Sequence, residues 1–149
     1  MEMSFNSTVL LLAILIPLAG GLVLLFVRNL SPGIVKLVAL TGFTLPLLIA
    51  VWLYFMFIDA TAQDGYRFVC RLPVGLESFG IYLHLGLNGV SLPLFFLSGL
   101  VGLAAGIFAL HSEARWKPAL LGLLLFMQSG LMGVFASVDL FFLYFFHEF

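Results

Sequence analysis

The chain has 149 residues, of which 63% are apolar and only 9% are charged, with a formal net charge of −1. A soluble domain has about 25% charged residues, so this chain cannot cover a water-facing surface. The six Lys and Arg residues are scattered, which excludes nucleic acid as a partner. Cys70 is the only cysteine, which excludes an intrachain disulfide and a CxxC site. We therefore predict an integral, multi-pass membrane protein.

Four stretches without Asp, Glu, Lys or Arg are long enough to cross the hydrocarbon core, which needs about 20 apolar residues. They predict spans near residues 8–27, 37–58, 91–110 and 118–138, and an apolar run over 140–149 is a fifth, incomplete span. The predicted fold class is an all-α polytopic membrane protein. Residues 1–149 form a single membrane domain, a transmembrane helix bundle of about four complete spans plus a truncated fifth.

The connection between the second and third spans, Asp59–Gly80, is long and carries several charges, so we expect it to lie outside the hydrocarbon. In the segment that follows, leucines alternate with Tyr82, His84 and Gly86, and an Asn88-Gly89 turn signal comes next. This period of two predicts a short strand or hairpin on one face of the membrane.

Local signals mark the starts of the later helices. Ser91 and Asp139 are predicted N-caps of the third and fifth helices, since their side chains can accept from free backbone N–H groups. Pro93 and Pro118 suit the first turns of the third and fourth helices, where a missing N–H has no cost.

The basic residues of short connections predict the orientation of the chain, because such residues favour the cytoplasmic side. Four of them flank the first and third connections, and two lie in the longer second connection among three acids. This places the first and third connections in the cytoplasm. The first and third connections are flanked by Arg28, Lys36, Arg115 and Lys117, and the second contains Arg67 and Arg71.

Small residues recur at every fourth position of the third and fourth spans, which is typical of helices that pack closely in a membrane. Gln128, midway along the fourth span, is a polar group for which we predict an interhelical hydrogen bond. The repeating residues are Ser98, Gly102 and Gly106, and Ser129, Gly133 and Ser137.

Glu148 is the candidate functional residue because of its predicted depth. It lies nine residues beyond Asp139, about 13 Å along a helix axis and thus near the middle of the hydrocarbon core. An ionised carboxylate there costs roughly 2.5–3.5 kcal/mol on insertion scales, unless it stays protonated or pairs with a cation of another helix. Either state makes it a candidate proton carrier. Two alternatives stay open: a neutral, hydrogen-bonded glutamate, or a last segment that does not insert.

His147 and Asp139 are candidate relay neighbours of Glu148. Histidine exchanges protons near neutral pH, although adjacent residues do not share a helix face and His147 can also be a neutral packing residue. Asp139 can be a helix cap or can guard proton access to Glu148. No cluster has metal-ligand spacing and no nucleotide or nucleophile motif occurs. We expect no metal, no bound cofactor and no redox centre in this chain.

Two stretches resemble those of a known family. Gly80–Leu97 (GIYLHLGLNGVSLPLFFL) resembles the loop-to-third-helix signature of the antiporter-like subunits of respiratory complex I, the proton-translocating NADH:quinone oxidoreductase. Gly130–Phe149 (GLMGVFASVDLFFLYFFHEF) is similar to the same family's approach to its fifth helix, G-V-F-x-x-x-D-L-x-x-F-Y-x-F-W-E. The resemblance covers essentially the whole chain and implies the N-terminal portion of such a subunit.

The resemblance also implies a function. The chain would be a non-redox subunit of a translocase, with other membrane-arm subunits and the lipid bilayer as partners. NADH, FMN, iron–sulfur clusters and quinone would be bound by partner subunits. The family's buried fifth-helix glutamate matches Glu148, and in the family it pairs with a lysine on the seventh helix and tunes its protonation. A bacterial inner membrane, or an organellar energy-transducing membrane, is the implied location.

The sequence departs from the family pattern in three ways. His147 stands where the family has Trp, and Asn88 stands where it has Asp. The sequence also stops within the fifth span, so we expect a fragment, a truncated product or one piece of a split subunit. The alternatives are a subunit of a multisubunit cation/proton antiporter or of a membrane-bound hydrogenase, and a non-functional or purely structural membrane fragment.

Overall fold

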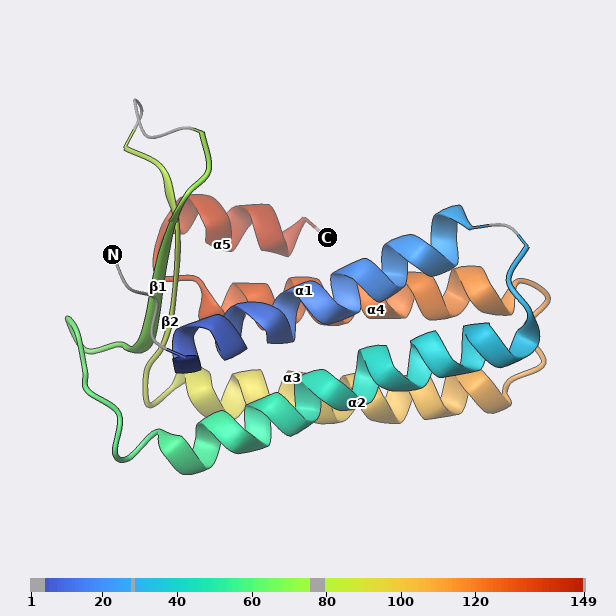
Figure 1. Ribbon diagram of the computed structural model, residues 1–149, viewed down its shortest axis with the longest axis horizontal. Coiled ribbons are helices and arrows are strands. Elements are labelled where there is room, and N and C mark those ends of the chain that lie inside the picture. Colours follow the sequence, from blue (N-terminus) through green and yellow to red (C-terminus); the bar gives the residue numbers. More distant parts are fainter. Residues whose placement is uncertain (1–4, 28, 76–79, 149) are drawn as a thin grey trace.

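The computed structural model describes residues 5–27, 29–75 and 80–148. Helices α1–α4 form an elongated bundle, a two-stranded sheet covers one end of it, and α5 lies along α4 (Figure 1). The described elements are α1 (Phe5–Phe26), α2 (Pro32–Met56), β1 (Arg67–Pro73), β2 (Tyr82–Leu87), α3 (Ser91–His111), α4 (Lys117–Ala136) and α5 (Leu140–His147).

Helices α1–α4 are each long and apolar enough to cross a membrane, which confirms the predicted polytopic helical fold. The second helix begins at Pro32 rather than near residue 37. Ser31 caps it by accepting a hydrogen bond from the N–H of Ile34 at 3.4 Å, and Pro32 occupies the first turn. The predicted boundary was set by the charge of Lys36, which marks the edge of an apolar stretch but does not end a helix.

The glycines of the predicted stripes, Gly102, Gly106 and Gly133, lie where side chains of neighbouring helices approach closely, which confirms their predicted role in helix packing. A Cβ atom on Gly106 would lie 2.3 Å from the ring of Phe43 in α2. A Cβ atom on Gly133 would lie 2.4 Å from the ring of Phe146 in α5. Because real Cβ atoms do not come this close, glycine sets the spacing between these helices.

The buried apolar side chains form two groups along the bundle. The larger group joins the sheet to α1–α5 through residues such as Leu85, Phe95 and Phe142. The smaller group, around Phe43 and Leu125, joins α1–α4. The sheet is therefore part of the packed structure and not a separate appendage.

The predicted strand is confirmed as β2, which pairs with β1 in an antiparallel sheet. Arg71 lies opposite His84, and a bulge between Arg67 and Cys70 places Phe68 at φ 58°. β1 lies within the connection Asp59–Gly80, for which the sequence predicts a position outside the hydrocarbon but no strand. Its two arginines and its bulge obscure the alternation by which a strand is recognised.

One of the two predicted caps is confirmed. The Asp139 carboxylate accepts from the N–H of Phe142 at 2.9 Å. Ser91 is not the cap of α3, because Asn88 accepts from the N–H groups of Val90 and Ser91 at 2.9 and 2.8 Å. The Ser91 hydroxyl accepts in return from the N–H of Asn88 at 2.9 Å. This exchange is a capping box, in which the serine is already part of the helix.

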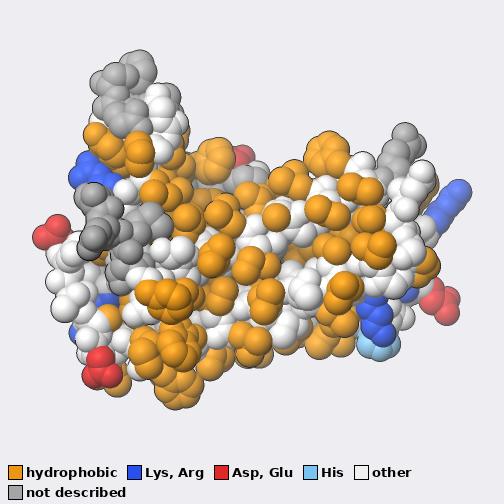
Figure 2. All heavy atoms as spheres, in the orientation of Figure 1, with side chains coloured by type: hydrophobic (Ala, Val, Ile, Leu, Met, Phe, Trp, Pro, Cys, Tyr) orange, Lys and Arg blue, Asp and Glu red, His pale blue; other side chains and the backbone are white. Residues whose placement is uncertain are grey.

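The connections α1–α2 and α3–α4 lie together at the end of the bundle opposite the sheet (Figure 1). Figure 2 shows apolar side chains over the flank of the bundle and basic ones near its two ends. Arg28, on which the predicted orientation partly depends, is outside the described residues. So are Glu77, which bounds an apolar stretch in the sequence, and Phe149 at the end of the fifth run. The orientation in the membrane stays a prediction.

Candidate functional site

The helix that carries Glu148 is positioned by the sheet. Between α4 and α5 the chain turns at Ser137–Asp139, and the N–H of Val138 donates to the carbonyl of His84 at 3.0 Å. Leu85 and Ser137 form a β-bridge beside this hydrogen bond. The α4–α5 turn is thus attached to β2, a contact between segments more than fifty residues apart that the sequence does not reveal.

Glu148 lies directly after α5, and its N–H donates to the carbonyl of Tyr144 at 3.2 Å. The inner face of α5 is apolar, with Phe142 and Phe146 buried against the rest of the bundle. The Glu148 side chain is 84% exposed with respect to the described chain. The bundle itself therefore does not bury this carboxylate, and its shielding from water stays a prediction.

The side chains of His147 and Glu148 approach each other, although adjacent residues do not share a helix face. Its Nδ1 atom is 3.7 Å from Oε1 of Glu148, and its side chain is 70% exposed. Although the two residues leave the helix in different directions, their side chains are long enough to meet. A protonated His147 would form an ion pair with the carboxylate, and a neutral one can exchange a proton with it through water.

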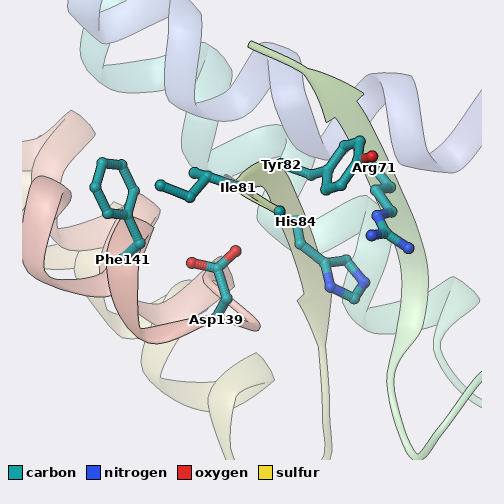
Figure 3. Close-up of a pocket in the computed structure, with 7 residues that line it drawn as sticks. Arg71, Ile81, Tyr82, His84, Asp139 and Phe141 are labelled. Carbon is teal, nitrogen blue, oxygen red and sulfur yellow. The ribbon is translucent and has the colours of Figure 1, made fainter. Parts of the chain in front are cut away.

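Asp139 lines a cavity of about 180 Å³ between the sheet and the start of α5 (Figure 3). His84 and Arg71 line the same cavity, and the guanidinium of Arg71 lies 4.1 Å from the ring centre of Tyr82. A water molecule occupies about 30 Å³ in the liquid, so the cavity has room for several. The structure thereby brings together two groups that can exchange protons, a carboxylate and an imidazole.

His84 and Arg71 were not predicted as neighbours of Asp139. The sequence analysis placed the segment of His84 at one membrane face, but nothing in it connects that segment to the start of the fifth helix. The pairing of β1 with β2 and the hydrogen bond from Val138 to His84 create this arrangement.

The predicted interhelical hydrogen bond of Gln128 is wrong for the described chain. Its side chain is 1% exposed, and its Oε1 atom has no hydrogen-bond partner among the described residues. Its Nε2 atom instead lies 3.9 Å from the sulfur of Met132 on the same helix. The adjacent Ser129 makes the interhelical bond, donating to the carbonyl of Ile14 in α1 at 2.8 Å. Close packing against Gly102, whose added Cβ would lie 2.3 Å from Oε1, holds the amide between α3 and α4.

Within residues 5–27, 29–75 and 80–148, no three His, Cys, Asp or Glu side chains gather into a group that could hold a metal ion. Cys70 is buried in β1, and desolvation raises the pKa of its thiol. A neutral buried thiol is a packing residue. The candidate functional residues are therefore Glu148 with His147, and Asp139 with His84.

Comparison with known proteins bears on this arrangement. No protein-family model matches the chain. NADH-quinone oxidoreductase subunit M of Pseudomonas aeruginosa is 29% identical over 140 residues, which are 91% of this chain and 27% of that protein. NADH-quinone oxidoreductase subunit 13 of Thermus thermophilus is 32% identical over 137 residues, 92% of this chain and 26% of that protein.

A third relative is named as a subunit of a different dehydrogenase. F(420)H(2) dehydrogenase subunit M of Methanosarcina mazei is 32% identical over 140 residues, 92% of this chain and 27% of that protein. The chain thus spans about a quarter of the length of the curated relatives that it matches. These similarities confirm the resemblance to an antiporter-like subunit. They also identify the relatives as subunit M, also called chain four, to which the chain as a whole is similar.

Proposed function

Because this chain is homologous over nine-tenths of its length to part of subunit M of NADH-quinone oxidoreductase, we propose that it acts as a membrane-arm subunit of such a complex. It participates there in moving protons across the membrane as quinone is reduced elsewhere in the complex. Its partners are the other membrane-arm subunits and the bilayer, and the redox cofactors belong to partner subunits. A subunit of an F(420)H(2) dehydrogenase is similarly related to this chain. The proposed role in proton movement therefore does not depend on NADH as the electron donor.

In this proposal Glu148 is the proton-carrying carboxylate. The observation that carries it is the position of this side chain. Glu148 directly follows an apolar helix, and its side chain is 84% exposed with respect to the described chain. A carboxylate on an apolar, membrane-embedded helix is costly unless it is neutral or paired. The exposed position allows a cation of another helix to reach it, and the pair can then exchange a proton.

His147 and Asp139 act in the proposal as relay neighbours. His147, 3.7 Å from Glu148, passes protons to or from that carboxylate. Asp139 stands nine residues earlier in the chain, in a cavity that it shares with His84. Protons would be taken up at this cavity, at the membrane face. Because α5 is apolar between Asp139 and His147, water or side chains of partner subunits would carry them on to Glu148.

The test replaces Glu148 by glutamine in the full-length subunit assembled in its complex. Glutamine keeps the shape but carries no proton, so we expect quinone-coupled proton pumping to fall at least about tenfold, as when a positioned proton-transfer group is lost. Pumping would be measured in vesicles with a pH-sensitive dye, and assembly by native electrophoresis. The matched control is Glu113→Gln, which removes an exposed carboxylate between α3 and α4. Unchanged pumping by a normally assembled Glu148→Gln complex would rule out the role.

A further inference from the structure

The end of the bundle opposite the sheet contains a second site, unrelated to Glu148. An open cleft of about 370 Å³ lies where the α1–α2 connection meets the ends of α3 and α4. Two lysines, Lys36 of α2 and Lys117 of α4, line it. We call it the lysine cleft; its walls include the apolar side chains of Leu30, Val35, Leu110 and Pro118.

The two lysines have no acidic partner in the part of the chain that the structure describes. No carboxylate there lies within ion-pair distance of either ammonium group. Lys117 donates from Nζ to the carbonyl of Leu110 at 3.1 Å, which uses one of its three N–H groups and holds the side chain over the cleft. The cleft therefore presents positive charge that the described chain leaves uncompensated.

Helix stability does not explain the position of Lys117. It is the first residue of α4, and the helix dipole disfavours a cation at a helix N-terminus. Trp116 beside it is 71% exposed, as is usual for tryptophans at the headgroup level of a membrane. From Trp116 we predict that the cleft lies at the depth of lipid headgroups, with its lysines toward water and its apolar wall toward the hydrocarbon.

We propose that the lysine cleft binds an anionic phospholipid, with the phosphate between Lys36 and Lys117 and the glycerol and upper acyl chain on the apolar wall. Charge complementarity argues for this occupant, because basic pockets between membrane helices select anionic headgroups over zwitterionic ones. A zwitterionic lipid would bring its own cation to the two ammonium groups. The predicted cytoplasmic orientation of this end agrees, since anionic lipids enrich that leaflet.

The test measures lipid selectivity of the full 149-residue chain in detergent by native mass spectrometry. The probes are phosphatidylglycerol and phosphatidylcholine with identical acyl chains. We expect the chain to prefer phosphatidylglycerol, and the preference to fall about fivefold for each lysine changed to glutamine. Lys36→Gln and Lys117→Gln are made singly and together, and Lys117→Arg should retain the preference. Circular dichroism confirms that each variant is folded.

Arg115→Gln is the matched control, because it removes one positive charge at the same end from a side chain that does not line the cleft. An equal loss of preference in this variant would show that general surface charge is responsible and would overturn the proposal. So would an unchanged preference in the double lysine variant. Inorganic phosphate at equal concentration should not displace the lipid, and full displacement would reduce the cleft to a simple anion site. Glu148→Gln should leave the preference unchanged, so this test is independent of proton pumping.

Discussion

The bundle α1–α4 and the helix α5 place their polar side chains in opposite ways. In α4, Gln128 and Ser129 point into the bundle and are at most 1% exposed. At the end of α5, the side chains of His147 and Glu148 are at least 70% exposed. The bundle is held together by its own contacts. The polar end of α5 has no such cover within the described chain, and the proposed pairing of Glu148 with another helix requires this arrangement.

The packing of the bundle predicts the largest effect on stability. Gly106→Val would place its Cβ 2.3 Å from the Phe43 ring, so we expect the free energy of unfolding to fall by at least about 1–3 kcal/mol. Gly33→Val is the control, because nothing lies within 4 Å of the Cβ position at Gly33. Unfolding by SDS in mixed micelles measures both. Equal stability of the two variants would show that α2 and α3 do not approach this closely.

The same change at Gly133 should affect α5 alone. Its Cβ would lie 2.4 Å from the Phe146 ring, so α5 should separate from α4 while α1–α4 stay folded. Hydrogen exchange would then rise over Leu140–His147 and stay unchanged in α1–α3. Faster exchange throughout the bundle would contradict this division of the molecule into a self-sufficient bundle and a dependent helix.

Asp139 allows its two roles to be separated. Asp139→Ala removes the hydrogen bond to the N–H of Phe142, so the docked state of α5 should lose about 0.5–2 kcal/mol. Asp139→Asn keeps an equivalent cap and should leave hydrogen exchange in α5 unchanged. If the proposed proton uptake is correct, Asp139→Asn nevertheless lowers proton pumping in the assembled complex. Normal pumping by this variant would leave Asp139 with a capping role only.

The adjacent polar residues of α4 predict the smallest effects, of opposite sign. Ser129→Ala loses the hydrogen bond to the Ile14 carbonyl, which in a membrane protein contributes about 0.6 kcal/mol and at most about 1.7. Gln128→Met replaces an amide whose Oε1 has no partner among the described residues, so stability should stay equal or rise by about 1 kcal/mol. Folding equilibria in mixed micelles measure both. A marked loss of stability in Gln128→Met would mean that this amide has a partner after all, such as a bound water.

The membrane class, the four spans, the strand at Tyr82–Leu87 and the cap at Asp139 could all be predicted from the sequence. Each follows from a local property: the length of an apolar stretch, a period of two, or a side chain that accepts from a nearby N–H group. The sequence also singled out Glu148, because an acid in an apolar run is unusual at any position in a fold.

Contacts between distant parts of the chain could not be predicted from the sequence and are set by how the elements pack. The pairing of β1 with β2, the attachment of the α4–α5 turn to His84, and the approach of Lys36 to Lys117 all join segments far apart in sequence. The sequence also predicted an interhelical hydrogen bond for Gln128, whereas the adjacent Ser129 makes it. One residue along a helix turns a side chain by about 100°, and only the position of the neighbouring helix decides which of two adjacent polar groups finds a partner.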